Sequence, residues 1–64
     1  MKFKINQIVR HVKNGCNYKI VGTPDKYLIT TGEPAYAYTR GEDADIYVRK
    51  QSEMEDGRFI AITS

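Results

Sequence analysis

The sequence predicts an all-β domain, a small barrel of five or six short antiparallel strands with one helical turn before the last strand. Two observations predict it. Short runs rich in Val, Ile, Tyr and Thr recur along the chain, and turn-forming Gly, Pro, Asn or Asp residues separate most of them. Only residues 51–55 have a helical character, and they precede the final apolar run. Such spacing is typical of a small β-barrel or sandwich.

The chain has 64 residues, enough for one domain over residues 1–64. A domain of this length buries only about 60% of the surface of its unfolded chain, so we expect modest stability. Cys16 is the only cysteine and His11 the only histidine, which excludes an internal disulfide and a Cys/His metal site, and we expect no cofactor. The lone cysteine favours a reducing compartment, and no apolar run follows the basic start. The sequence therefore predicts a cytoplasmic protein without a membrane span.

A β-hairpin is predicted near the start of the chain. Residues 8–13 are rich in branched side chains, residues 17–21 form the returning run, and Asn14-Gly15 lies between them. Asn-Gly is favoured in two-residue primed turns because both residues tolerate a positive φ. Gly15 is therefore assigned a structural role. The preceding residues 1–5 form either a short strand or a loose arm.

Three further β-prone runs follow the hairpin, at residues 26–31, 35–39 and 46–49. The middle run alternates between alanine and tyrosine. Because alternate residues of a strand point to opposite faces, Tyr36 and Tyr38 share one face and the alanines share the other. Such a strand is expected to pack its small face closely against a neighbouring segment.

The segment before the last strand completes the predicted fold. Ser52 and Glu55 have the spacing of a capping box. The segment is too short for a free helix, so we expect a single turn of 3₁₀ type. Met54 would point into the core, and Asp56-Gly57 would reverse the chain into a last strand that begins near Phe59. One helical turn just before the final strand is the usual layout of an SH3-like barrel.

Arg49 and Arg58 flank three acidic residues, Glu53, Glu55 and Asp56. One interpretation is a network of ion pairs around the helical turn, because guanidinium groups match carboxylates well. The other is that the arginines bind a phosphate or a carboxylate of a partner. We assign Arg58 a structural role, and we expect Arg58→Ala to lower the melting temperature rather than abolish binding selectively.

Tyrosine is the residue type here that is most typical of an interaction surface, since it combines a large contact area with a polar tip. In small barrels, aromatic grooves bind proline-rich peptides or stack bases. The alternative is that tyrosines complete a core that aliphatic side chains alone cannot close, and at least two are expected there. The chain has five: Tyr18, Tyr27, Tyr36, Tyr38 and Tyr47.

The site prediction separates partner-binding from structural residues. The partner-binding residues are Arg10, Lys13, Tyr36, Tyr38, Tyr47 and Arg49. The structural residues are Gly15, Tyr18, Met54, Asp56, Gly57, Arg58 and Phe59. No catalytic residue is assigned, because the proximity of His11 and Cys16 across a hairpin is automatic and no oxyanion-hole feature accompanies them. No metal site is assigned either, because the acidic run Glu42, Asp43 and Asp45 lacks the spacing of a calcium-binding loop.

The charge is unevenly distributed, although the net charge is only +2. Residues 1–26 hold six basic residues and one acidic residue, whereas the rest of the chain holds four basic and seven acidic residues. A basic half is typical of nucleic-acid binding. The alternative is that the lysines keep the edges of the sheet soluble.

The chain resembles a family of short, uncharacterised phage and bacterial proteins. The residues that carry the resemblance are Val9-Arg10-His11-Val12-Lys13-Asn14-Gly15 with Tyr18-Lys19-Ile20-Val21-Gly22, the central Ala35-Tyr36-Ala37-Tyr38, and 47–59. The family pattern opens V-R-H-x-K-x-G-x-x-Y-x-V and ends W-V-R-P-x-x-E-F-x-D-G-R-F, and the match covers about residues 8–60. This sequence departs from the pattern at Tyr47, Lys50 and Met54, where the family has Trp, Pro and Phe. The resemblance implies an SH3-like barrel of phage or prophage origin and implies no activity.

These observations favour a non-enzymatic protein-interaction module, a phage accessory protein that binds and modulates a host protein. The alternative is a small nucleic-acid-binding barrel that uses Arg10, Lys13, Lys19 and Lys26 together with the tyrosines. An enzyme is the least favoured class, because no motif carries chemistry. A homodimer is compatible with either function, since a short barrel leaves strand edges open.

Overall fold

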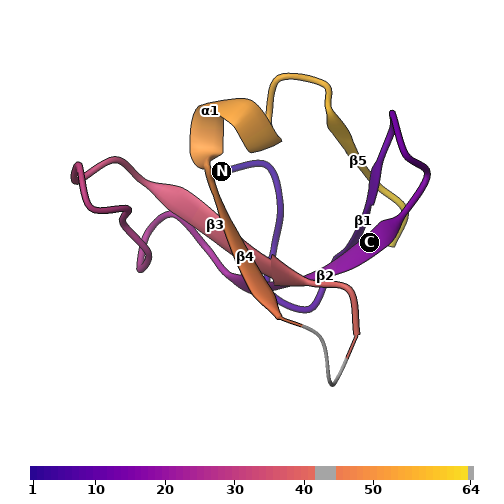
Figure 1. Ribbon diagram of the computed structural model, residues 1–64, viewed down its shortest axis with the longest axis horizontal. Coiled ribbons are helices and arrows are strands. Elements are labelled where there is room, and N and C mark those ends of the chain that lie inside the picture. Colours follow the sequence, from indigo (N-terminus) through magenta and orange to yellow (C-terminus); the bar gives the residue numbers. More distant parts are fainter. Residues whose placement is uncertain (42–44, 64) are drawn as a thin grey trace.

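The computed structural model describes residues 1–41 and 45–63, and within them it confirms the predicted all-β fold. Five strands and one helical turn follow one another along the chain (Figure 1). They are β1 (Ile8–His11), β2 (Asn17–Gly22), β3 (Ala35–Thr39), β4 (Ile46–Lys50), α1 (Gln51–Met54) and β5 (Phe59–Ala61). No helix in these residues is long and apolar enough to cross a membrane.

The strands form one antiparallel sheet in the order β4-β3-β2-β1-β5. Consecutive strands pair along the chain, except that β5 returns to the far side of β1. The sheet bends along β2, so that β3 and β4 face β1 and β5 across the core, and α1 covers one end (Figure 1). The ladder is irregular between Ile20 and Gly22, and such an irregularity bends a strand. This order and the turn before the last strand are those of an SH3-like barrel.

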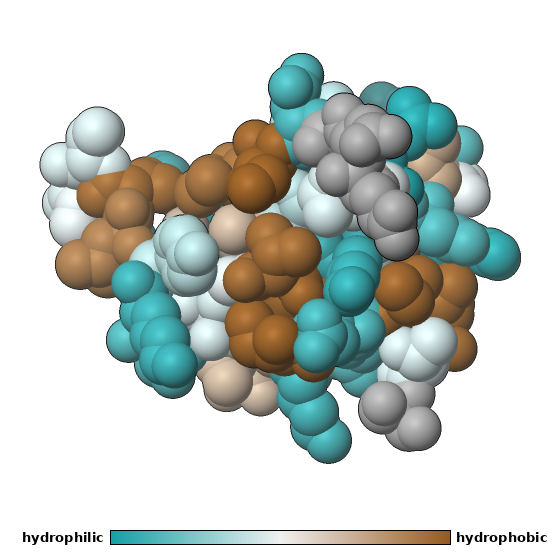
Figure 2. Space-filling model, turned by 90° about the horizontal axis from the view of Figure 1, so that it is seen from below, coloured by the Kyte–Doolittle hydropathy of each residue, from teal (hydrophilic) through white to brown (hydrophobic). Residues whose placement is uncertain are grey.

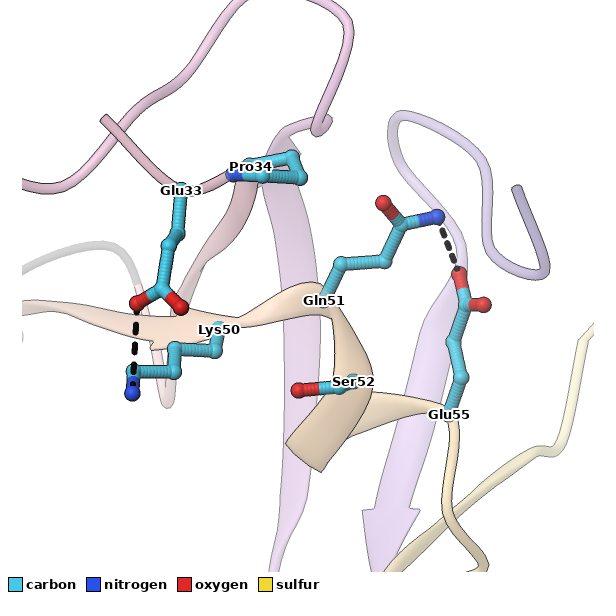
Figure 3. A pocket seen from close by; sticks show the side chains of 6 residues that line it. All are labelled: Glu33, Pro34, Lys50, Gln51, Ser52 and Glu55. Carbon is cyan, nitrogen blue, oxygen red and sulfur yellow. Dashed lines mark hydrogen bonds and ion pairs between the residues drawn. The ribbon is translucent and has the colours of Figure 1, made fainter. Parts of the chain in front are cut away.

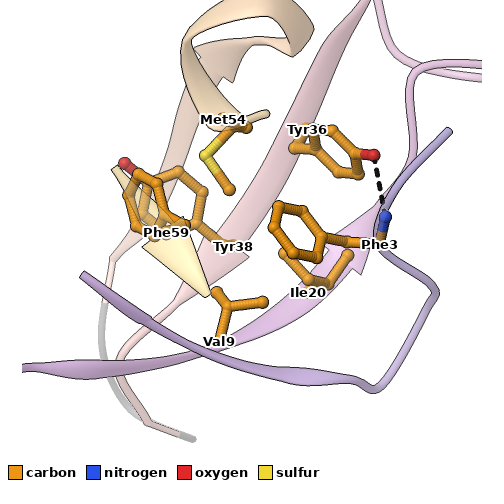
Figure 4. Close-up of a cluster of buried hydrophobic side chains, with 7 residues drawn as sticks. All are labelled: Phe3, Val9, Ile20, Tyr36, Tyr38, Met54 and Phe59. Carbon is orange, nitrogen blue, oxygen red and sulfur yellow. Dashed lines mark hydrogen bonds between the residues drawn. The ribbon is translucent and has the colours of Figure 1, made fainter. Parts of the chain in front are cut away.

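The core lies between the two halves of the bent sheet (Figure 4). Every strand except β4 contributes to it, and Met54 from α1 fills its upper part, as predicted. Both faces of β3 are buried, because Ala35 and Ala37 on the outer face are covered as well as the two tyrosines on the inner face. The buried cluster comprises Phe3, Val9, Ile20, Tyr36, Tyr38, Met54 and Phe59, with Tyr18 packed against it.

The first residues form an arm that is fixed to the barrel, not a strand. Phe3 is 1% exposed and its ring meets the Tyr36 ring edge-on at 5.6 Å. The backbone N–H groups of Lys2 and Phe3 both donate to the Tyr36 hydroxyl, each at 3.0 Å. Of the two predicted alternatives for residues 1–5, a short strand and a loose arm, the structure contains an arm, but this arm is packed against the barrel and not loose. The arm is ordered because its one large apolar side chain belongs to the core.

The first hairpin is present, but the prediction of a two-residue primed turn is wrong. The His11 N–H donates to the Cys16 carbonyl, so the loop holds the four residues between them. Only Gly15 has a positive φ, of 72°. The Asn14 side chain accepts from the Cys16 N–H at 2.8 Å instead of entering the left-handed region itself. The structural role of Gly15 is thus consistent with its geometry, within a longer loop.

Residues 26–31 do not form the sixth strand that the sequence suggested. They contribute one isolated bridge, between Leu28 and Pro34, because the segment folds back on itself. The Tyr27 ring instead packs over Gly22, where an added Cβ would lie 2.2 Å from the ring. The Ala35 N–H donates to the Tyr27 carbonyl at 3.0 Å, which holds this segment against the start of β3.

The turn before β5 differs from the prediction in two details. It is α-helical and not 3₁₀, since the Glu55 N–H donates to the Gln51 carbonyl four residues earlier. Its N-cap is Lys50 and no side chain caps it, so Ser52 and Glu55 do not form the predicted capping box. The Asp56-Gly57 reversal is as expected: Gly57 has a φ of 106°, and the Asp56 carboxylate accepts from the Arg58 N–H at 3.2 Å.

Candidate functional site

Three tyrosines meet on one side of the core and form a graded aromatic surface. Tyr38 on β3 is 6% exposed, Tyr18 on β2 is half-buried, and Tyr47 on β4 is 45% exposed. The Tyr38 and Tyr47 rings stack at 5.7 Å, and Tyr18 meets Tyr38 edge-on at 5.1 Å. These positions are neighbours because Tyr38 pairs with Tyr47 across the β3–β4 ladder. A continuous path of aromatic rings therefore leads from the core to solvent.

Arg49 lies beside these rings. Its Nε donates to the Tyr38 hydroxyl at 3.4 Å, and its guanidinium lies 5.7 Å from the centre of the Phe59 ring. The hydrogen bond to Tyr38 raises the pKa of Arg49 above its ordinary value, so the side chain stays charged. The Glu53 carboxylate lies 3.9 Å from the Arg49 guanidinium, and the Arg49 side chain is 31% exposed. We call Tyr18, Tyr38, Tyr47 and Arg49 the tyrosine–arginine surface.

A groove of about 710 Å³ adjoins this surface, between the β1–β2 loop and the turn before β5. Arg58 pairs with Asp56 at 3.2 Å and with Glu53 at 3.9 Å. The predicted ion pairs around the helical turn are thus present for Glu53 and Asp56 but not for Glu55, and Glu53 lies between the two arginines. The groove is basic on balance, because it is lined by three basic side chains and one carboxylate. Its lining residues are His11, Val12, Lys13, Arg49, Asp56, Gly57 and Arg58.

The other side of the core is closed by hydrogen bonds. The Tyr36 hydroxyl donates to the Glu55 carboxylate at 2.5 Å, and the same carboxylate oxygen accepts from the Lys2 N–H at 2.9 Å. Burial and the bond to Glu55 raise the pKa of Tyr36 to about 12. Burial acts to raise the pKa of Glu55, but bonds from Tyr36, Lys2 and Gln51 lower it overall. We call Phe3, Tyr36 and Glu55 the N-terminal seal.

A second hollow, of about 360 Å³, lies next to the N-terminal seal (Figure 3). Its polar side chains already bond to one another. Lys50 pairs with Glu33 at 3.2 Å, and the Gln51 amide donates to Glu55 at 3.1 Å. The bond from Lys50 lowers the pKa of Glu33. The charged side chains that line this hollow are therefore already engaged.

The structure gathers only part of the predicted partner-binding set. Lys13, Tyr38, Tyr47 and Arg49 lie on or beside the groove. Arg10 does not, because it projects from the outer face of β1 and donates to the Asn17 side chain at 3.1 Å. Tyr36 has an exposed fraction of 0% and belongs to the N-terminal seal, so its side chain offers no surface to a partner.

His11 and Cys16 lie near each other through their backbones, as hairpin geometry requires. The His11 Nδ1 accepts from the Asn14 N–H at 3.4 Å, and its ring packs edge-on against Phe59 at 4.8 Å. The Cys16 thiol lies 3.9 Å from the Asn14 carbonyl oxygen. Among residues 1–41 and 45–63, no cluster of His, Cys, Asp or Glu could hold a metal ion. Glu42 and Asp43 of the acidic run lie outside the described residues.

The outer face of the sheet is a further candidate. A hollow of about 560 Å³ crosses the strands β1 to β4, with Ile8, Val21 and Ile46 among its lining residues. Figure 2 shows the molecule from below, where hydrophobic residues form several patches separated by hydrophilic side chains. One patch belongs to the segment between β2 and β3 that projects to the left in Figures 1 and 2, where Leu28 is 65% exposed.

Sequence analysis missed two residues that define the site. Phe3 lies in a segment without a strand partner, and its alternation with lysines was the only signal that it faces inward. Glu55 was assigned to a capping box or to ion pairs, whereas it binds Tyr36 and the N-terminal arm. No local pattern contains this contact, because Glu55 and Lys2 are 53 residues apart in the sequence.

Comparison of the chain with protein-family models, with curated proteins and with solved structures gives no significant match. The resemblance to the family of phage and bacterial proteins therefore stays a prediction that is based on the sequence pattern alone.

Proposed function

We propose that this protein is a non-enzymatic protein-interaction module, encoded by a phage or prophage, that binds and modulates a host protein in the cytoplasm. The observation that carries the proposal is the tyrosine–arginine surface beside an open groove. A few residues supply most of the binding energy in protein interfaces, and tyrosine and arginine are enriched among them. Here Arg49 is held by Tyr38 and Phe59, so little side-chain freedom is lost on binding.

The charges around the groove indicate the chemistry of the partner segment. Lys13, Arg49 and Arg58 line it against a single lining carboxylate, Asp56. The exposed Tyr47 ring adds an apolar surface beside the groove, on the side of β4. A segment with a carboxylate next to an apolar or aromatic side chain matches both features, because the carboxylate replaces the weak 3.9 Å pairing of Arg49 with Glu53.

We also propose that the protein has no enzyme activity, and the surroundings of His11 and Cys16 support this. A nucleophile needs a base within hydrogen-bond reach and a third group that orients the base. The His11 ring packs on Phe59 and accepts a bond from the Asn14 N–H, and the Cys16 thiol lies 3.9 Å from the Asn14 carbonyl oxygen.

Capture from a bacterial lysate with matched variants tests the proposal. Tyr47→Ala and Arg49→Ala alter the tyrosine–arginine surface, whereas Arg10→Ala alters an arginine on the outer face of β1. We expect a protein that wild type and Arg10→Ala capture equally, and whose affinity falls about 30-fold or more for each surface variant in calorimetry with the purified partner. Equal capture by all four folded proteins would show that the surface is not the binding site.

Nucleic acid is the second candidate, favoured by the three basic side chains that line the groove next to exposed Tyr47. Glu53 and Asp56 weigh against it, because each lies close to an arginine that phosphates would need. Fluorescence anisotropy with single-stranded and duplex oligonucleotides separates the two candidates. A nucleic-acid binder loses affinity steeply with added salt. No binding to either oligonucleotide at low salt would exclude nucleic acid as the partner.

A further inference from the structure

The edge strand β4 carries exposed apolar residues on both of its faces. Ile46 is 64% exposed and Val48 52% exposed on the outer face, and Tyr47 is 45% exposed on the inner face. β4 ends the sheet, and among the described strands only β3 pairs with it. An exposed apolar edge of this kind is a template for pairing with another strand.

The direction of the backbone groups of β4 follows from one hydrogen bond and the register. The Gln51 N–H donates to the Pro34 carbonyl at 2.9 Å, in the same register that pairs Lys50 with Ala35. In an antiparallel ladder the residues that bond to one neighbour alternate with those that point away from it. The N–H and C=O groups of Ile46, Val48 and Lys50 therefore point away from β3, toward the open edge.

We propose that β4 pairs antiparallel with β4 of a second copy of this chain, with Val48 of one copy opposite Val48 of the other. In this register Ile46 lies opposite Lys50 of the second copy, so the three outward-pointing residues bond only to one another. Residues on the inner face also match, since Tyr47 lies opposite Arg49 of the second copy, a cation–π pair. No like charges are opposed within β4, and opposed like charges would destabilise the pair.

The other edge of the sheet lacks these features. β5 has three residues, and the Ile62 N–H donates to the Ile8 carbonyl, so Ile60 and Ile62 bond toward β1. The groups that β5 directs outward come only from Phe59 and Ala61, which gives a shorter ladder than β4 offers. Self-pairing is therefore specific to β4.

Pairing by β4 also fits the size of the chain. A domain this short gains stability from self-association, since its own core is small. An isologous pair has two-fold symmetry and closes on itself, so it produces a dimer and not a fibre. Arg49 of β4 lines the groove but Val48 does not, so a substitution at Val48 tests self-association without changing a residue that lines the groove.

Sedimentation equilibrium on three proteins tests the proposal. Val48→Lys places two charges opposite each other at the centre of the pair, whereas Ile60→Lys makes the same change at a similarly exposed position on β5. We expect wild type and Ile60→Lys to dimerise as concentration rises to about 1 mM, and Val48→Lys to stay monomeric with unchanged circular dichroism. A wild type that is monomeric throughout, or a dimer that survives Val48→Lys, would overturn the proposal.

Disulfide trapping tests the register. The pair that Val48 forms with itself exchanges hydrogen bonds, and such a pair has a Cα separation of about 5.5 Å, within the range of a disulfide. In a Cys16→Ser background, we expect Val48→Cys to form a covalent dimer under mild oxidation and Ile60→Cys to remain uncrosslinked. Equal crosslinking of both variants, or none at Val48, would contradict pairing centred on this residue.

Discussion

Tyr36 and Tyr38 lie two residues apart on β3 and both point into the core, yet their hydroxyl groups meet different surroundings. The Tyr36 hydroxyl bonds to Glu55 and to two backbone N–H groups of the N-terminal arm. The Tyr38 hydroxyl accepts from Arg49, next to exposed Tyr47 and the groove. One side of the core is thus sealed by the chain itself, whereas the other side ends in rings and a charge at the surface. The contrast separates residues that stabilise the fold from residues that are available to a partner.

The strongest way to break this contrast is to remove the side chain at the centre of the N-terminal seal. Phe3→Ala leaves a cavity beside Tyr36, and we expect the free energy of unfolding to fall by about 3–5 kcal/mol. A domain of this size rarely has more than about 3–5 kcal/mol in total, so a large fraction of the molecules should be unfolded at room temperature. Chemical denaturation followed by circular dichroism measures the loss.

Ile5→Ala is the matched control for Phe3→Ala, because Ile5 lies in the same arm and is 49% exposed. We expect a change within about 0.5 kcal/mol. Similar losses for both variants would show that the arm contributes through general contact and not through the seal.

Acidic pH weakens the same side of the core. The pKa of Glu55 is lower in the folded chain than its ordinary value of 4.5, so its carboxylate form stabilises the fold. This contribution is present above pH 4.5 and is lost as the pH falls through the lower folded pKa. We expect Glu55→Gln to cost about 1.5–3 kcal/mol at neutral pH and to flatten the decline of stability below pH 4.5. Urea midpoints measured across this range test both effects, and parallel curves for the two proteins would contradict them.

The turn at the groove is sensitive for a different reason. Gly57 has a φ of 106°, which a residue with a Cβ adopts only under strain, although open space surrounds the position. We expect Gly57→Ala to cost about 1–2 kcal/mol through backbone strain alone. Gly41→Ala, where no positive φ is recorded and space is also open, is the control and should leave the thermal midpoint nearly unchanged.

Arg58 gives the smallest expected effect. Its pairs with Asp56 and Glu53 are about half exposed, and exposed ion pairs contribute less than about 1 kcal/mol. We expect Arg58→Ala to lower the melting temperature slightly and to keep the fold in scanning calorimetry. A variant of unchanged stability that no longer binds the captured partner would instead make Arg58 a contact residue.

Local patterns in the sequence predicted the strands, the helical turn and the reversal at Asp56-Gly57, because each depends on neighbouring residues. They did not predict the hairpin loop, where the Asn14 side chain bonds Cys16 and lengthens the turn. They also did not predict that residues 26–31 leave the sheet, because the packing of Tyr27 over Gly22 depends on the bend of β2.

The division of the tyrosines could not be predicted for the same reason. Alternation along β3 places Tyr36 and Tyr38 on one face, but it does not identify the groups that meet their hydroxyls. Glu55 is 19 residues from Tyr36 in the sequence, and the arm is 33 residues or more away. Contacts at such separations follow from the closed barrel and not from any local pattern.

Chemical denaturation of Tyr36→Phe and Tyr47→Phe tests the central contrast most directly, because the same single hydroxyl is removed from each side of the core. We predict that loss of the Tyr36 hydroxyl lowers the free energy of unfolding by about 1–3 kcal/mol, since it leaves Glu55 and two backbone N–H groups without this partner. Loss of the Tyr47 hydroxyl should change it by less than about 0.5 kcal/mol. Equal losses for the two variants, or a larger loss at Tyr47, would contradict the separation of a sealed side from an open one.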